Sequence, residues 1–120
     1  MNIAIYGRPV NPKQVELAER VIQLLQKAGD QFSIHEPYLQ FLSKHMKLDV
    51  KTPTFLTHED LRGKTDFLLS IGGDGTLLDT VLLVKDSGIP IAGINAGRLG
   101  FLSSISEENL SLALESLAKG

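Results

Sequence analysis

The 120-residue sequence contains no cysteine, so disulfides, thiolate zinc sites and cysteine nucleophiles are excluded. It also lacks an excess of positive charge, because 12 lysines and arginines stand against 14 aspartates and glutamates. No basic run or aromatic-basic stripe is present, which argues against nucleic-acid binding. The first residues show neither a basic leader nor a long apolar core. The sequence therefore predicts a cytoplasmic protein that does not enter the membrane.

The composition is that of a single soluble globular domain, with 42% hydrophobic and 22% charged residues. A chain of this length can bury one core but not two, so residues 1–120 are expected to form one domain. The three histidines, His35, His45 and His58, have no metal-ligand spacing. No protein metal site is predicted.

Four short apolar segments have the length and composition of β-strands. They are residues 2–6, 31–36, 66–71 and 91–94. The last two are continuous apolar runs, as in parallel strands that are covered on both faces.

Segments with helical periodicity alternate with these strands. Helices are predicted from Pro12 to the residue before Gly29, from Gly75 to about Asp86, and after Ser106. In the second of these helices the apolar positions that fit the helical period are Leu78, Val81, Leu82 and Val84. Residues 37–65 are predicted to be a helix followed by an irregular connection. Alternating β and α elements predict an α/β fold, with an open, mostly parallel Rossmann-like sheet and helices on both faces.

A glycine-rich turn follows the apolar run at 66–71, with the sequence Gly72-Gly73-Asp74-Gly75-Thr76. Ligands of open parallel sheets bind beyond the carboxyl ends of the strands, where the start of a helix offers unpaired N–H groups to an anion. Glycine allows the backbone to approach such a ligand closely. The turn is therefore predicted to hold phosphate groups.

Asp74 does not fit a site whose only task is to bind phosphate, because a carboxylate repels that group. Its side chain is ionised at neutral pH and can accept a proton from a hydroxyl or hold a cation. Both roles fit a phosphotransferase, in which the carboxylate activates the acceptor hydroxyl. The structural alternative is that Asp74 caps the following helix. The turn matches neither G-x-G-x-x-G nor a Walker A loop, which argues against dinucleotide oxidoreductases and P-loop enzymes.

A second segment, Asn95-Ala96-Gly97-Arg98-Leu99-Gly100-Phe101-Leu102, follows the strand at 91–94 and would lie beside the glycine turn if the two strands are neighbours. Together, "GGDGTLL" and "INAGRLGFL" resemble the N-terminal half of NAD kinases. The first stretch is shared with diacylglycerol-type lipid kinases and, more loosely, with phosphofructokinases. The second is much more specific to NAD kinases.

The resemblance covers the whole chain, whereas members of that family are normally more than twice as long. It implies that a β-rich C-terminal domain, which carries an Asn-Glu pair and much of the NAD surface, is missing here. The implied reaction transfers the γ-phosphate of ATP to the 2′-hydroxyl of the adenosine ribose of NAD, giving NADP. Mg²⁺ would arrive with ATP, full-length members would be dimers or tetramers, and this domain alone would be inactive.

The resemblance also implies roles for individual residues. Asp74 would be the base that deprotonates the ribose hydroxyl, and Gly75 would approach NAD. The residues implied to shape the nucleotide-binding turn are Gly72, Gly73 and Thr76. Those implied to pack against NAD, or alternatively to seal the core, are Leu78, Leu99 and Phe101.

Three polar residues near strand ends complete the predicted site. Asn95 and Arg98 are expected to order their loop or to meet phosphate. Arg8 could bind ATP phosphates in bidentate fashion. Asp79 stands where NAD kinases often have a basic residue or a histidine, so no family contact is transferred to it. Its charge suits the beginning of a helix.

Two other functions remain open at this point. One is a lipid or sugar kinase that shares only the glycine turn. The other is a nucleotide-binding module without catalysis.

Overall fold

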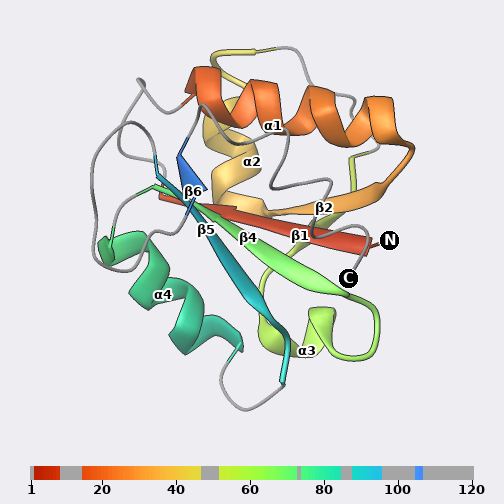
Figure 1. Cartoon of the computed structure of the whole chain (residues 1–120), viewed down its shortest axis with the longest axis vertical. Helices are drawn as coiled ribbons and strands as arrows, with labels where there is room; N and C mark the ends of the chain where they lie inside the picture. The colour runs from red at the N-terminus through yellow and green to blue at the C-terminus, as the bar shows by residue number, and fades with distance from the viewer. Residues whose placement is uncertain are drawn as a thin grey trace.

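The chain forms one six-stranded sheet in a computed structural model that describes residues 2–8, 15–46, 52–72, 74–84, 88–95 and 105–106 (Figure 1). The strand order is β3-β2-β1-β4-β5-β6, and every pairing is parallel. The strands are β1 Asn2–Gly7, β2 Gln31–His35, β3 Thr54–Phe55, β4 Phe67–Ile71, β5 Ile91–Asn95 and β6 Ile105–Ser106. The predicted α/β fold with a parallel sheet is confirmed.

Helices cover both faces of this sheet (Figure 1). They are α1 Val15–Ala28, α2 Glu36–Leu42, α3 His58–Leu61 and α4 Asp74–Val84. α1 and α2 lie on one face, and α3 and α4 lie on the other. None of the helices in the described ranges has the length and apolar character that crossing a membrane requires.

Two apolar clusters fill the space between the sheet and its helices. Ile3 and Ile5 of β1 belong to the cluster under α1 and α2, whereas Ala4, between them, belongs to the cluster on the α4 face. This alternation follows from the two-residue period of a strand. All five residues of β4 are buried. The continuous apolar run at this position in the sequence is therefore explained by coverage on both faces.

The structure corrects the predicted boundaries at three places. Glu36 begins α2 instead of ending a strand, because Pro37 occupies the first turn of the helix, where its fixed φ is favourable. The connection at 37–65 contains the strand β3, which is only two residues long and is held by pairing with β2. Ser106 lies in β6 instead of opening a helix. The helix predicted after it falls outside the described residues.

Helix α4 is confirmed, but it packs on the sheet through an unexpected set of side chains. Among the side chains of α4 that the structure describes, the buried ones are Thr76, Thr80 and Val84, which recur every four positions and so share one face. By contrast, Leu78 is 54% exposed and Leu82 is 71% exposed. Of the apolar positions that indicate this helix in the sequence, only Val84 is therefore buried against the sheet, whereas Leu78, Val81 and Leu82 are exposed.

Gly7, at the end of β1, leaves room for the ring of Tyr38. A Cβ atom at Gly7 would lie 2.7 Å from Tyr38 Cε1 and closer still to Cζ. The Tyr38 side chain is only 1% exposed, and its hydroxyl has no hydrogen-bond partner among the described residues. Burial raises the pKa of this hydroxyl above its usual range. The absence of a side chain at residue 7 is therefore a packing requirement of α2.

We expect Gly7→Ala to lower the free energy of unfolding by about 1–3 kcal/mol, because the added methyl group overpacks the site against the Tyr38 ring. Urea denaturation of the two chains measures the difference. In a Tyr38→Leu background the same substitution should cost clearly less, since the ring is gone. An equal cost in both backgrounds would mean that the ring is not the obstacle.

Candidate functional site

Three predicted site residues lie directly beyond one row of paired residues that crosses three strands. Gly7 of β1 pairs with Ile71 of β4, and Ile71 pairs with Ile94 of β5. The residues that follow this row, at the carboxyl edge of the sheet, are Arg8, Gly72 and Asn95. The strand at 91–94 and the strand before the glycine turn are thus neighbours, which is the condition for the two motifs to lie side by side.

The first residue of the glycine turn needs to be glycine for two reasons. Gly72 has φ 144°, a conformation that side chains disfavour. In addition, a Cβ atom there would lie 2.6 Å from Thr76 Oγ1. The close approach of Gly72 to Thr76 brings the turn directly onto the start of α4, whose first N–H groups open at the carboxyl edge.

Asp74 and Gly75 are the first two residues of α4, and Asn95 is the last residue of β5, where it pairs with Ser106. The structure describes these positions through the backbone. Thr76 is buried, with its side chain against Gly72, and Leu78 is exposed on the outer side of α4. The remaining predicted residues lie outside the described part of the chain; they are Gly73, Arg98, Leu99 and Phe101. The roles assigned to all these residues remain predictions.

Arg8 has a partner that the sequence did not suggest. Its Nε lies 2.6 Å from Asp79 Oδ2 of α4, and the two side chains are 45% and 32% exposed. The Tyr6 hydroxyl donates to the same carboxylate oxygen at 3.3 Å. These three residues tie the carboxyl end of β1 to the second turn of α4.

The electrostatics of this cluster follow from its contacts. The hydrogen bond from Arg8 lowers the pKa of Asp79 below its usual value, although partial burial acts in the opposite direction. Burial, followed by the charge of Asp79, raises the pKa of Tyr6. Asp79 is therefore a structural anion held in the ionised state. Its position near the beginning of a helix is consistent with the prediction from charge, but its partner comes from a distant strand.

Two further residues of the site region were missed by sequence reasoning. Thr80 of α4 is fully buried, and its Oγ1 lies 2.9 Å from Ser70 Oγ of β4 and 2.9 Å from the Thr76 carbonyl oxygen. A signal was present in the sequence, because Thr76 and Thr80 stand four apart in a helix that is otherwise rich in leucine.

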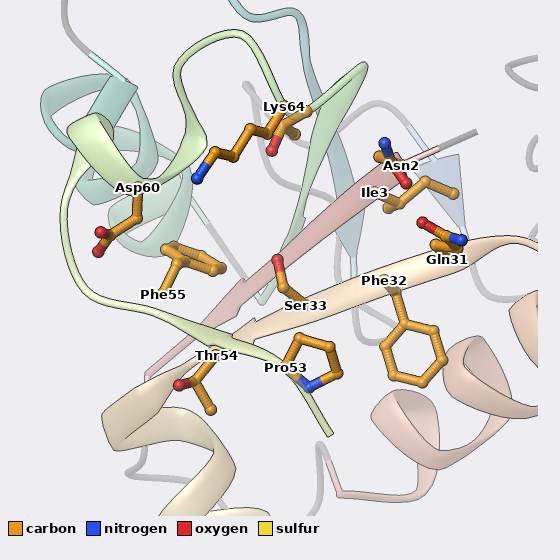
Figure 2. Close-up of a pocket in the computed structure, with 11 residues that line it drawn as sticks. Asn2, Ile3, Gln31, Phe32, Ser33, Pro53, Thr54, Phe55, Asp60 and Lys64 are labelled. Carbon is orange, nitrogen blue, oxygen red and sulfur yellow. The ribbon is translucent and has the colours of Figure 1, made fainter. Parts of the chain in front are cut away.

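The structure offers no assembled protein site for a metal in the described ranges, where no three His, Asp or Glu side chains converge. A hollow of about 500 Å³ opens at the other end of the sheet (Figure 2). It is lined near the amino ends of β1 and β2 by Asn2, Gln31 and Ser33, with Lys64 and Phe55 around it. None of the predicted site residues lines this hollow. In parallel sheets ligands bind at the opposite, carboxyl edge.

Comparison with known proteins relates the whole chain to one family. The family described as the ATP-NAD kinase N-terminal domain matches residues 3–120. The chain is 38% identical to the NAD kinase of Cytophaga hutchinsonii over 124 residues, covering 100% of this chain and 41% of that protein. It is also 38% identical to the NAD kinase of Methanothermobacter thermautotrophicus, covering 100% of this chain and 40% of the relative.

A solved structure of yeast NADH kinase complexed with NADH has a similar fold, with a TM-score of 0.79 and 23% sequence identity. The match covers 99% of this chain and 38% of the yeast protein. The chain thus spans about 40% of the length of the curated relatives named above.

The Arg8–Asp79 pair predicts a pH-dependent contribution to stability. Because the pKa of Asp79 is lower in the folded than in the unfolded chain, the contribution is present above the unfolded value of 3.8. It is lost as the pH falls through the folded value. We expect Asp79→Asn to be less stable than the wild type at pH 7, and the difference to shrink below pH 3.8. Chemical denaturation across this pH range measures it.

The double variant Arg8→Gln/Asp79→Asn serves as the control, since removing both charges leaves no unpaired partner. It should show little of the pH-dependent difference, and added salt should weaken the effect in the wild type because the pair is partly exposed. A deficit in Asp79→Asn that is the same at every pH would contradict the assignment.

Proposed function

The chain belongs to the ATP-NAD kinase N-terminal domain family, and we propose that it supplies the catalytic base and part of the nucleotide site of an ATP-dependent NAD kinase. In this reaction the γ-phosphate of ATP passes to the 2′-hydroxyl of the adenosine ribose of NAD. The products are ADP and NADP. A C-terminal domain, of the kind that would account for the greater length of the relatives, would complete the site.

One observation carries the proposal: Asp74 is the first residue of α4, immediately beyond the carboxyl end of the central strand β4. The neighbouring strand β1 ends at the same level, and β5 ends one residue beyond it. A nucleotide bound over this edge meets a carboxylate and the N–H groups of a helix start within one turn of chain. The combination suits a transfer of phosphate to a hydroxyl better than phosphate binding alone.

The chemistry assigned to the chain's own residues follows from this arrangement. Asp74 accepts the proton of the ribose 2′-hydroxyl as its oxygen forms a bond to the γ-phosphorus. The bond from that phosphorus to the oxygen bridging to the β-phosphate breaks, and ADP leaves with the electron pair. N–H groups at the start of α4 stabilise the phosphate charge. Mg²⁺ enters bound to ATP and not through a protein cage.

The remaining residues take secondary roles in the proposal. Gly72, Gly73 and Gly75 allow the backbone to approach the nucleotides. Leu78, which is 54% exposed beside the turn, offers an apolar contact to NAD, as Leu99 and Phe101 would. The polar groups assigned to phosphate or to loop order are Arg8, Asn95 and Arg98. Arg8 would have to share its guanidinium between Asp79 and phosphate. The complete protein is proposed to be a cytoplasmic dimer or tetramer.

The base assignment is tested with Asp74→Asn in the complete gene product. Removing a general base should lower kcat by about 10²-fold or more, while the dissociation constant for NAD changes little. Steady-state assays of NADP formation and calorimetry with NAD give the two quantities. Glu16→Gln is the matched control, because it removes an exposed carboxylate from α1, on the opposite face of the sheet. If Asp74→Asn keeps near-normal turnover, Asp74 is not the base.

Substrate identity is tested separately with labelled ATP and three acceptors: NAD, diacylglycerol and fructose 6-phosphate. Transfer to NAD alone is expected. Transfer to the lipid or the sugar phosphate would instead support a kinase that shares only the glycine turn. Saturable binding of NAD or ATP by the complete protein, without transfer to any acceptor, would indicate a binding module.

A further inference from the structure

Polar side chains are buried in the contact between β4 and the first turns of α4. The buried polar side chains in the described part of the chain are Ser70, Thr76 and Thr80, with exposures of 2%, 5% and 0%. All three lie in this one interface, and none belongs to the clusters formed by the other helices.

The hydroxyls of Ser70 and Thr80 form a connected chain of hydrogen bonds. Thr80 Oγ1 lies 2.9 Å from Ser70 Oγ and 2.9 Å from the Thr76 carbonyl oxygen. A hydroxyl both donates and accepts, so both contacts are satisfied together when Ser70 donates to Thr80 and Thr80 donates to the carbonyl. Each of the two hydroxyls is then paired.

The residue before Thr80 makes a matching contact with the neighbouring strand. Asp79 accepts from Tyr6 of β1, and Tyr6 is paired directly with Ser70 across the sheet. Two consecutive residues of α4 therefore bond to two side chains in the same row of the sheet. A slip of α4 by one residue would move it about 1.5 Å and turn it about 100°, breaking both contacts together. Apolar packing, which is not directional, would resist such a slip less specifically.

We infer that Ser70 and Thr80 are positioning residues that fix where the start of α4, and with it Asp74, stands relative to the carboxyl edge of the sheet. Asp74 precedes Thr80 by six residues, or about 9 Å along the helix axis. Thr76 lies between them, buried against Gly72. The bond acts through the rigid helix and not through contact with a nucleotide. This inference rests on the proposed role of Asp74.

The test uses Thr80→Val, which keeps the shape of the side chain and removes its hydroxyl. In the complete protein we expect kcat for NAD phosphorylation to fall by roughly 10- to 100-fold, because small displacements of a catalytic group are costly. The KM for NAD should change much less. Thr80→Ser, which keeps the hydroxyl, should restore most of the activity. Ser70→Ala should reproduce the loss from the other side of the bond, and it substitutes for Thr80→Val if that variant does not fold.

Ile22→Val is the stability control, because it truncates a buried side chain of α1 on the opposite face of the sheet. At a temperature where all variants are folded, its kcat should stay within about twofold of the wild type. If Thr80→Val and Ser70→Ala lose thermal stability as Ile22→Val does but keep wild-type kcat, they have a purely structural role. The inference is then overturned while the proposed function stands.

A second measurement does not depend on activity. In the 120-residue chain, amide hydrogen exchange of α4 should accelerate at least tenfold in Thr80→Val relative to the amides of β1, and Ile22→Val should show no such selective effect. Unchanged exchange in α4 would overturn the inference by itself. If the wild-type protein transfers phosphate to no acceptor, the proposed function fails. Exchange in α4 then still decides whether the hydroxyl pair holds the helix.

Discussion

Parallel pairing of β4 with both β1 and β5 determines where every candidate residue lies. The row Gly7, Ile71 and Ile94 is level across three strands, so the chain leaves the sheet three times at one edge. Backbone hydrogen bonds impose this level, because parallel strands in register cannot slide independently. Residues separated by more than 80 positions, such as Arg8 and Asn95, are thereby brought to the same side of the molecule. A site for a long ligand such as a dinucleotide needs this kind of convergence.

The helix that begins at this edge is attached in an unusual way. Helices that are apolar on all sides are normally buried on all sides. α4 instead turns two threonines and Val84 to the sheet and leaves Leu78, Val81 and Leu82 between 49% and 71% exposed. Hydrogen bonds fix the orientation of the face of α4 that packs on the sheet. The outer face presents large apolar side chains beside Asp74. The second property fits the proposed contact of Leu78 with NAD.

The ion pair between Arg8 and Asp79 is a second polar contact between α4 and the carboxyl edge of the sheet. It joins β1 to α4, whereas the Ser70–Thr80 bond joins β4 to α4. The pair is partly exposed, so its contribution to stability is expected to be small and to depend on salt and pH. Its larger consequence is for the site, because an arginine that was predicted to meet phosphate already has a carboxylate partner. Phosphate binding at Arg8 would therefore be coupled to the position of α4.

Local patterns in the sequence determined the elements with long, distinctive signals. The apolar run of β4, the glycine turn and the stripe of α1 each carry their own evidence, and the alternation of strands and helices determined the fold class. The shortest strands were not predicted. β3 and β6 are two residues long and exist because a neighbouring strand supplies their hydrogen bonds. No pattern within two residues can encode that pairing.

The same limit applied to the site. The sequence placed Asp74 at a strand-to-helix turn, because glycines and the preceding apolar run are adjacent in the chain. It did not reveal the residues that contact α4. They are Tyr6 on β1, Arg8 directly after β1 and Ser70 on β4, and these contacts join residues 10 to 73 positions apart. The sequence also predicted an apolar stripe on α4, but not whether that stripe faces the sheet or the outside. Only the tertiary structure, by setting the strand order and register, decided that Thr76 and Thr80 face the sheet and that Leu78 and Leu82 face outward.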